Sequence, residues 1–346
     1  MTDLLDDHDV LLADLDGTLY RGPEVVPGAV EAVRGAAGRG VRTVYVTNNA
    51  SRRPVDVAVH LAELGFPATE QDVVASSQAA AALLAAQLPA GAPVLVVGTD
   101  ALAEEVVGAG LAVAADAERA VAVVQGHSPD TGWRGLAEAT VALRAGALWV
   151  ACNVDPTLPT ERGPLPGNGS MVAALRTASG RVPQVAGKPA PALLQEAARR
   201  TGARSPLMIG DRLDTDVEGG RAAGMATLLV MTGVSDAAEL LAAPPQRRPD
   251  LVAADLDALT ARAGALAPGP RAGWTVEAGA QLRLGGAGDP LDALRALCHV
   301  HWGRGGGPIG VVADGADAAA ALTALGLPSA TVAGVPPSHD PAGAAR

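Results

Sequence analysis

Two aspartates separated by one residue, Asp14 and Asp16, are the side chains of this chain best placed to do chemistry. They follow the apolar run Val10–Ala13, which has the length and composition of a buried strand, and they precede Gly17 and Thr18. Ligands in an open parallel sheet bind beyond the carboxyl ends of the strands. At such an edge one carboxylate can attack phosphorus while the other transfers a proton. An acidic turn that only ends a strand is the alternative interpretation of the same residues.

A second group of polar residues offers partners for a phosphate. Thr47, Asn48 and Asn49 follow a β-branched run and carry hydroxyl, amide and backbone donors that suit phosphate oxygens. Lys188, in a Gly-Lys-Pro triplet, is a compact cation that can neutralise a phosphoryl group during transfer. Taken alone, the first cluster is typical of a polar turn before a helix, and the lysine is typical of a solvated surface. Their proximity in the chain to predicted strand ends favours the binding role.

A third group of residues predicts a metal site. The run Gly210–Asp216 contains three aspartates and follows the apolar strand Leu207–Ile209. With the Asp-x-Asp pair these carboxylates form an oxygen-rich set, and hard oxygen ligands with few nitrogens or sulfurs select magnesium. The same acids could begin a helix, with Asp214 or Thr215 as its N-cap. Because four polar clusters each follow a predicted strand, we favour one shared site that binds Mg²⁺ and a phosphate.

The elements that must position these groups alternate between short apolar strands and longer Ala- and Leu-rich helices. This rhythm predicts an α/β fold with a Rossmann-like, doubly wound parallel sheet and helices on both faces. Helices are predicted over Val30–Gly38 and Pro54–Leu64, with another that ends at Leu88. Further strands are predicted over Val41–Val46, Val73–Ala75, Val94–Val97, Ala120–Val124, Leu148–Ala151, Pro206–Ile209 and Thr227–Val230.

The composition of the 346-residue chain argues against several classes of protein. Hydrophobic residues make up 49% of the chain and disfavour disorder, while the formal net charge of -11 disfavours nucleic acid and anionic membranes as partners. Two cysteines, Cys152 and Cys298, are too few for a disulfide framework. The N-terminus does not read as a signal peptide, and no apolar stretch is long enough to span a bilayer. We expect a cytoplasmic protein.

Together these motifs resemble the haloacid dehalogenase (HAD) superfamily, in the subfamily IIA of phosphatases with a large inserted α/β cap. The similarity covers roughly residues 11–259 and includes two cap segments, Cys152–Asp155 and Pro166–Ser170. The resemblance implies that Asp14 is the nucleophile, which forms an aspartyl-phosphate, and that Asp16 is the general acid/base.

The same resemblance assigns the phosphate and metal ligands. It implies that Thr47 and Lys188 bind the phosphoryl oxygens. It implies that Mg²⁺ is held by Asp14, by the backbone carbonyl of Asp16 and by Asp211. Asp216 is then expected just outside these ligands, where it positions Lys188 or metal-bound waters.

The resemblance also divides the chain. Residues 1–80 and 183–262 are expected to form the HAD core, and residues 81–182 the inserted cap. Residues 272–346 are expected to form a small α+β C-terminal domain. Caps of this type often pair subunits, so the resemblance also makes a homodimer a candidate assembly.

A cap that closes over the site excludes water and bulky molecules, so we expect a small phosphorylated metabolite as substrate. In relatives that dephosphorylate vitamin B6 phosphate, a histidine follows Asp-Pro in the cap loop. Here Asp155-Pro156-Thr157 is followed by Leu158, which disfavours pyridoxal phosphate. Phosphoglycolate and glycerol 3-phosphate remain. We predict glycerol 3-phosphate, because the length and C-terminal extension resemble glycerol phosphate phosphatases of high-GC bacteria, which act in recycling phospholipid head groups. A phosphotransferase and an inactive binding protein are the alternatives from other classes.

The C-terminal region has no place in a phosphatase core. Ala261–Ala272 is predicted to be a linker, Trp274–Leu284 a strand and Pro290–Val300 a helix. The glycine run Gly303–Gly307 invites comparison with acetyltransferases, whose acyl-carrier pyrophosphate binds a Gly-rich turn at a helix N-terminus. Because the region is too short for a complete domain of that kind, we interpret it as a truncated, inactive remnant used for packing or regulation.

The remaining features receive no catalytic role. His299 and His301 would share a face on a strand and could bind a metal there, but the sequence shows no third ligand. His60 and His127 belong to no visible constellation. The last residues, Val335–Arg346, are expected to be a frayed tail.

Overall fold

The computed structural model of the chain describes residues 2–158, 160 and 162–327, which form two compact units. The first unit comprises the residues up to Ser235 together with Pro245–Ala267. The second comprises Asp236–Pro244 and the residues from Pro268 onward. The expected tail, Val335–Arg346, and the end of the predicted C-terminal domain lie outside the described residues.

A six-stranded parallel sheet forms the core of the first unit and confirms the predicted fold class. The strands lie in the order β15 (Leu251–Ala253), β14 (Ala226–Val230), β13 (Pro206–Gly210), β1 (Val10–Ala13), β4 (Arg42–Thr47) and β5 (Val73–Ala75). In chain order this is the 3-2-1-4-5-6 arrangement of doubly wound sheets, in which the order reverses between β1 and β13. Such sheets bind ligands in the crevice at the carboxyl ends of those two strands.

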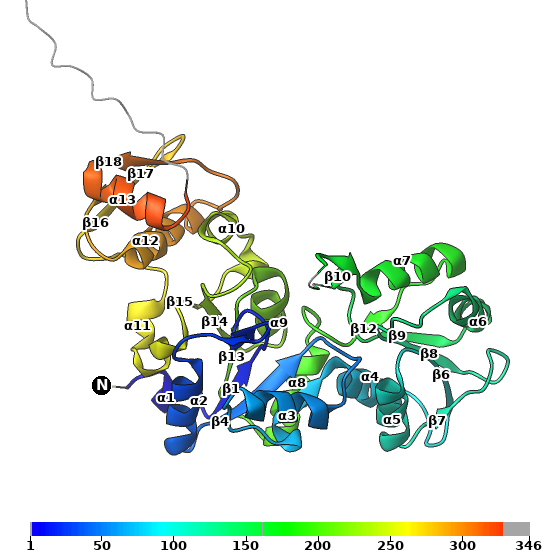
Figure 1. The fold of residues 1–346 in the computed structure, drawn as a ribbon. Helices are drawn as coiled ribbons and strands as arrows, with labels where there is room; N and C mark the ends of the chain where they lie inside the picture. Colours follow the sequence, from blue (N-terminus) through cyan, green and yellow to red (C-terminus); the bar gives the residue numbers. More distant parts are fainter. Residues whose placement is uncertain (1, 159, 161, 328–346) are drawn as a thin grey trace, which may run out of the picture. The chain divides into compact units, whose positions relative to one another are not determined.

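Helices cover both faces of this core sheet, because its strands are apolar on both sides (Figure 1). Alternate residues of β1 point to opposite faces, so Leu11 and Leu12 belong to different apolar clusters. Helices on the Leu11 side are α1 (Leu4–Asp7), α2 (Ala29–Gly38), α3 (Pro54–Glu63) and α11 (Ala263–Leu266), and α8 (Ala192–Thr201) lies on the other. Shorter core elements are β2 (Tyr20–Arg21), β3 (Glu24–Val25) and α9 (Glu218–Ala222).

The cap is a second parallel sheet in the same unit. Its strands lie in the order β12 (Gln184–Val185), β9 (Leu148–Ala151), β8 (Ala122–Gln125), β6 (Pro93–Val97) and β7 (Ala112–Val113). α6 (Trp133–Arg144) and α7 (Asn168–Ser179) cover one face, and α4 (Ser76–Ala85) and α5 (Asp100–Gly108) cover the other (Figure 1). A short hairpin, β10 (Thr157–Leu158) and β11 (Leu165–Pro166), precedes α7.

One apolar cluster joins the two sheets of the first unit. It contains Leu12 and Val44 of the core, Val124 and Val150 of the cap, and buried residues of α4 and α8. This continuity of buried apolar surface explains why core and cap form one compact unit rather than two.

The last cap strand departs from the division expected from the sequence, in which the second part of the core begins at residue 183. Gln184 and Val185 pair with Val150 and Ala151 of the cap sheet. Lys188 therefore follows a cap strand. A two-residue strand offers too little periodic pattern for its sheet to be assigned from sequence.

The second unit is a small α+β structure, as predicted. β16 (Trp274–Ala278) is antiparallel to β17 (Leu282–Gly286), which pairs in parallel with β18 (Val311–Asp314). Its helices are α12 (Pro290–Trp302), α13 (Ala316–Ala324) and α10 (Ala237–Ala242). α10 lies between β14 and β15 in the chain but packs on α12, where Trp302 Nε1 donates to Leu241 O at 3.2 Å.

Several details of this region differ from the sequence-based expectation. The strand expected over Trp274–Leu284 is a hairpin that turns at 279–281, and the expected linker contains α11, whose Leu266 is buried. The glycines Gly303–Gly307 follow the C-terminus of α12, so they do not form the expected turn at a helix N-terminus. His299 and His301 lie on a helix, where His301 is buried with Nε2 2.7 Å from Gly307 O while His299 is exposed.

Candidate active site

Asp14 stands at the carboxyl end of β1, at the point where the strand order of the core reverses. Its N–H donates to Ile209 O at 2.9 Å and continues the ladder with β13. The chain then turns sharply at Gly17, whose φ of 87° lies in the left-handed region. As a result the two carboxylates of the Asp-x-Asp pair differ: Asp14 is largely buried and Asp16 is exposed.

Lys188 lies buried between two of the predicted acids. Its Nζ is 2.5 Å from Asp14 Oδ1 and 2.7 Å from Asp216 Oδ1, and its side chain is 2% exposed. Burial alone would lower the pKa of Lys188, but the two carboxylates outweigh this effect and raise it above its usual value. The lysine is therefore a permanent positive charge at the bottom of the site.

Asp14, Asp211 and Asp216 present carboxylate oxygens within 4.8 Å of one another, which brings predicted residues from two separate segments together. Burial raises the pKa of Asp14, and repulsion by Asp211 adds to this, against the opposing effect of Lys188. Burial also raises the pKa of Asp211 to about 6, with repulsion by Asp216 adding to it. Burial and repulsion by Asp14 raise the pKa of Asp216 to about 6, against the opposing effect of Lys188. Crowded carboxylates with raised pKa values indicate a site that favours an added cation.

Asp211 is held by the loop after β14. Its Oδ2 accepts a hydrogen bond from Val234 N–H at 2.7 Å, and its Oδ1 lies 3.3 Å from the donating Thr18 hydroxyl. A Cβ at Gly233 would lie 1.9 Å from Asp211 Oδ2, so the close approach of the backbone to this carboxylate requires glycine at position 233. Sequence reasoning placed Thr18 in the Asp-x-Asp motif without giving it a role, and it did not find Val234, because a backbone N–H carries no sequence pattern of its own.

The donor set fits magnesium. Asp14 and Asp211 offer hard oxygen ligands. Lys188 contacts Asp14 and Asp216, and Asp211 lies beside them, so three carboxylates neighbour one lysine and negative charge is in excess. Asp216 is already engaged, since its Oδ2 accepts from Arg212 N–H at 3.1 Å and its Oδ1 faces Lys188. Asp16 lines a hollow at this edge of the core sheet, and its side chain is exposed there. Its carboxylate is therefore accessible for proton transfer.

The Thr47-Asn48-Asn49 cluster ends β4 beside these acids and lines the same hollow. Thr47 Oγ1 accepts from Asn49 N–H at 3.1 Å. Asn49 Oδ1 accepts from the N–H and the hydroxyl of Ser51, at 2.9 and 2.6 Å, and so caps the turn. Asn48 binds the backbone of Lys188. Both asparagine side chains are thus bonded to protein.

The hollow above the acids has a volume of about 1120 Å³. The cap contributes His127, Pro129, Asp155 and Leu158 to its wall. His60, from the core, also lines it, and its ring meets the edge of Tyr20 with centroids 5.3 Å apart. Sequence reasoning gave neither histidine a role, although His127 follows the end of β8, a position that could have indicated it. The candidate residues in the wall are Asp14, Asp16, Thr47, Asn48, Asn49 and Lys188, and the remaining wall comprises Leu15, Gly17, Arg21, Gly22, Pro23, Ser51, Arg52, Arg212, Thr215, Gly233 and Val234.

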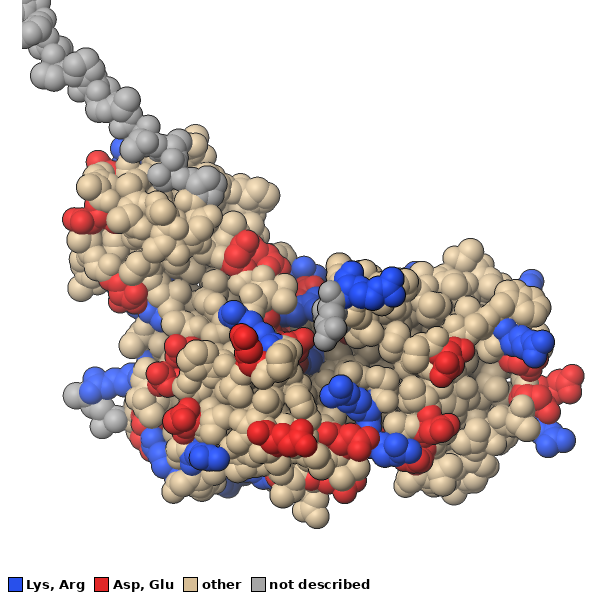
Figure 2. Space-filling view, in the orientation of Figure 1, with Lys and Arg blue, Asp and Glu red and all other residues tan. Residues whose placement is uncertain are grey.

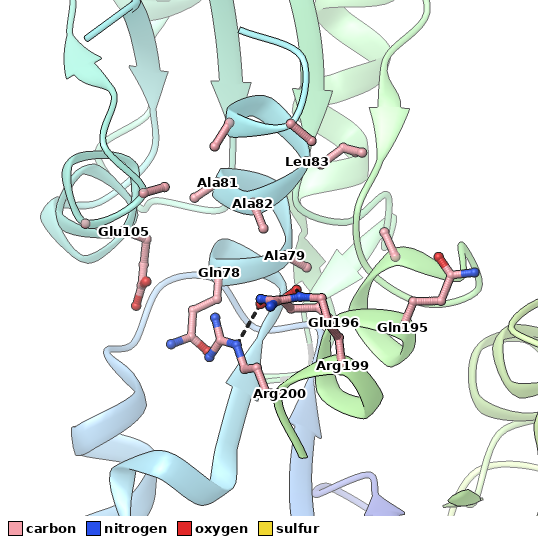
Figure 3. Close-up of a pocket in the computed structure, with 15 residues that line it drawn as sticks. Gln78, Ala79, Ala81, Ala82, Leu83, Glu105, Gln195, Glu196, Arg199 and Arg200 are labelled. Atoms are coloured by element: carbon pink, nitrogen blue, oxygen red, sulfur yellow. Dashed lines mark hydrogen bonds and ion pairs between the residues drawn. The ribbon is translucent and has the colours of Figure 1, made fainter. Parts of the chain in front are cut away.

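A second hollow, of about 600 Å³, lies between α4, α5 and α8 (Figure 3). Alanines of α4 form much of its wall, and Arg200 Nε donates to Glu196 Oε1 at 2.7 Å beside them. None of the candidate residues lines it.

On the face seen in Figure 2, charges of both signs are interspersed among the described residues, so the acidic surplus is spread out there. None of the described helices is both long and apolar enough to cross a membrane.

Comparison with known proteins identifies the class. Residues 11–112 match the haloacid dehalogenase-like hydrolase family, residues 185–259 match a HAD-hydrolase-like family, and residues 271–327 match the GCN5-related N-acetyltransferase like domain. The chain is 55% identical over 280 residues to a D-glycerol 3-phosphate phosphatase of Mycobacterium tuberculosis, which covers 81% of this chain and 78% of that protein. It is 40% identical over 226 residues to a 5'-nucleotidase of Bacillus subtilis, covering 65% and 87% respectively.

Comparison with solved structures points to the same class of protein. Crystal structures of a Mycobacterium tuberculosis glycerol phosphate phosphatase, in complex with calcium and with magnesium, match with TM-scores of 0.90 and 0.89. Each is 50% identical and covers 94% of this chain and 99% of the other. The chain belongs to the haloacid dehalogenase-like hydrolase family. Within that family it is a phosphatase, which confirms the enzyme class predicted from sequence.

Proposed function

We propose that this phosphatase hydrolyses glycerol 3-phosphate to glycerol and phosphate, with Mg²⁺ as its cofactor. The observation that carries the chemistry is the buried Lys188, which contacts Asp14 and Asp216 beside Asp211 at the reversal point of the core sheet. The similarity to a glycerol 3-phosphate phosphatase, over both the enzyme and the C-terminal region, supports the choice of substrate.

Each candidate residue has a proposed part in the reaction. A carboxylate oxygen of Asp14 attacks phosphorus and forms an aspartyl-phosphate, while the alcohol leaves with a proton from Asp16. Asp16 then takes a proton from the water that hydrolyses this intermediate. Lys188 and the Thr47 hydroxyl donate to the phosphoryl oxygens, where charge develops.

Asp14, Asp211 and the backbone carbonyl of Asp16 would hold Mg²⁺, and Asp216 would fix Lys188. When bound, the ion supplies positive charge that offsets the repulsion between a carboxylate and a phosphate dianion. This assignment places Asp216 beside the metal ligands, because its Oδ1 forms the ion pair with Lys188 at 2.7 Å while its Oδ2 accepts from Arg212 N–H.

A phosphate-release panel tests the substrate. Glycerol 3-phosphate, phosphoglycolate, pyridoxal phosphate, a sugar phosphate and a nucleoside monophosphate are compared with Mg²⁺ and with EDTA. We expect the highest kcat/KM for glycerol 3-phosphate and loss of all activity with EDTA. A higher kcat/KM for pyridoxal phosphate or the sugar phosphate would refute the substrate. Phosphate transfer to an added sugar, seen by product analysis, would instead favour the phosphotransferase.

We also propose the remaining sequence-based assignments. The division into core, cap and C-terminal domain is retained, with the cap extended through β12 and Asp236–Pro244 moved from the core to the C-terminal unit. The C-terminal unit is an inactive remnant, so titration with acetyl-coenzyme A should release no heat. A homodimer is tested by light scattering coupled to gel filtration. A cytoplasmic location stays a prediction.

A further inference from the structure

The side-chain amide of Asn48 is bonded to the backbone of the lysine at the centre of the site. Lys188 N–H donates to Asn48 Oδ1 at 2.8 Å, and Asn48 Nδ2 donates to Lys188 O at 2.9 Å. An N–H needs an acceptor and a C=O needs a donor, so these partners fix the orientation of the amide. One side chain thus pairs with both peptide groups of Lys188, as a neighbouring strand would.

Lys188 needs such a partner because its backbone belongs to the cap while its charge acts in the core. After β12, Ala186 N–H donates to Ala151 O at 2.9 Å, and Gly187 N–H donates to Cys152 O at 2.7 Å. The cap ladder therefore runs up to the residue before Lys188. Yet the ammonium group of Lys188 contacts Asp14, at the end of a core strand.

Asn48 also fastens the cap loop after β9. Its backbone carbonyl oxygen accepts from Asn153 Nδ2 of that loop at 2.7 Å, and also from the hydroxyl of Ser76, the first residue of α4, at 2.6 Å. Its Nδ2 lies 3.3 Å from Asp155 Oδ2. A Cβ at Gly187 would lie 2.6 Å from Asn48 Oδ1, so glycine there permits the approach. Core strand, cap loop and lysine segment thus meet at one residue.

We propose that Asn48 is a positioning residue. Its side-chain amide holds the backbone of Lys188, which follows a cap strand, so that the ammonium group of Lys188 lies at Asp14. The sequence-based role, direct binding of phosphate, is thereby replaced for this side chain by an action through Lys188. The inference rests on the proposed function, because it requires Lys188 to bind the phosphoryl group.

Titration calorimetry with inorganic phosphate, in the presence of Mg²⁺, tests this on four proteins: wild type, Asn48→Ala, Lys188→Met and the double variant. We expect each single substitution to weaken phosphate binding by about 10-fold or more, as for a lost hydrogen bond to a charged group. The double variant should bind no more than twofold more weakly than Lys188→Met. Additive losses would show that Asn48 contacts phosphate independently, and unchanged binding by Asn48→Ala would show that it does not position the lysine; either overturns the proposal.

Two further outcomes separate this inference from the proposed function. Unchanged phosphate binding by Lys188→Met would remove the role of Lys188 and the inference with it, while hydrolysis by the wild type would leave the phosphatase assignment standing. A wild type that neither binds phosphate nor hydrolyses phosphate esters would refute the proposed function itself.

Steady-state kinetics supply a matched control. Gln87 and Gln184 exchange two hydrogen bonds, at 3.0 and 2.9 Å, that also tie β12 to its surroundings, but at the exposed end away from Asn48. Gln87→Ala should leave kcat unchanged, whereas Asn48→Ala should lower it. Asn48→Ser, which keeps a polar group, provides a second variant in case the alanine variant does not fold. An equal loss of kcat in Gln87→Ala would mean that general loosening of β12 explains the effect, which contradicts the proposal.

Discussion

Core and cap are both parallel doubly wound sheets, but they differ at their carboxyl edges. The core has the order 3-2-1-4-5-6 and places Asp14 and Asp211 after the adjacent strands β1 and β13. The cap has the other common order, 2-1-3-4-5, and its reversal lies between β6 and β8. There the residues after the two strands are Gly98 and Gly126.

The reversal point of the cap is filled rather than open. A Cβ at Gly126 would lie 3.1 Å from Leu102 Cδ2 and 3.2 Å from Ala50 Cβ, so apolar groups already occupy that space. Strand order therefore provides a place where a ligand could bind, and the side chains decide whether the place becomes a site. In this unit the core edge carries the reactive groups, while the cap edge contributes wall residues and, from its last strand, Lys188.

The largest effect should follow from Asp14→Asn, which removes the reactive oxygen at the core edge. We expect kcat to fall by about 10⁴-fold or more, as when other catalytic nucleophiles are removed. The fold should persist, because asparagine has the same shape and Lys188 keeps its contact with Asp216. Phosphate release and thermal unfolding measure the two quantities. Residual activity near that of the wild type would end the assignment of the nucleophile.

Lys188→Met should have the next largest effect and tests whether the cap supplies charge to the core. Loss of one group that stabilises transition-state charge lowers kcat by about 10²–10³-fold. The substitution also leaves Asp14 and Asp216 facing each other without a cation, and removing one partner of a buried ion pair costs about 3–5 kcal/mol. Denaturant unfolding with and without Mg²⁺ should show that the ion recovers part of this loss. An unchanged kcat in this variant would show that the reaction depends only on residues of the core sheet and not on Lys188.

The pH dependence of metal stabilisation sharpens the picture of the core edge. Burial raises the pKa values of Asp211 and Asp216 from 3.8 to about 6. Between these values the metal-free folded protein keeps protons that the unfolded chain releases, so its stability falls as pH rises. Mg²⁺ binds the deprotonated carboxylates, so the rise in Tm that it causes should be larger at pH 7.5 than at pH 5. Equal rises at both pH values would show that Asp211 does not hold the ion.

Most functional residues of the core could be predicted from sequence, because they lie at the ends of apolar strands. Asp14 and Asp211 directly follow such strands and Thr47 ends one, and parallel strands bring their carboxyl ends to one edge. The HAD-like order of motifs added the roles. The fold class followed from the same alternation of strands and helices.

The cap contribution was less readable for a physical reason. β12 is two residues long, so nothing in its pattern assigned Lys188 to the cap sheet. The two bonds of Asn48 to the backbone of Lys188 join residues 140 positions apart, and no local signal reports such a contact. The hairpin within 274–284 was missed because its turn at 279–281, Gly-Ala-Gln, contains one glycine but no proline, asparagine or aspartate to mark it, so the run resembles one continuous strand.

The smallest expected effect concerns the cap wall, and it bears on what that wall contributes. Leu158 lines the hollow. By the resemblance described from sequence, it stands where phosphatases of vitamin B6 phosphate are expected to have a histidine. Leu158→His adds a polar ring without touching Asp14 or Lys188, so the turnover of glycerol 3-phosphate should stay within a few fold. The ratio of kcat/KM for pyridoxal phosphate to that for glycerol 3-phosphate should rise by about 10-fold, as for one changed contact in a pocket. Leu158→Met is the matched control, because it changes shape but adds no hydrogen-bonding group. A fall in kcat for both substrates, equal in the two variants, would mean that the cap wall acts on the chemical step rather than on the choice of substrate.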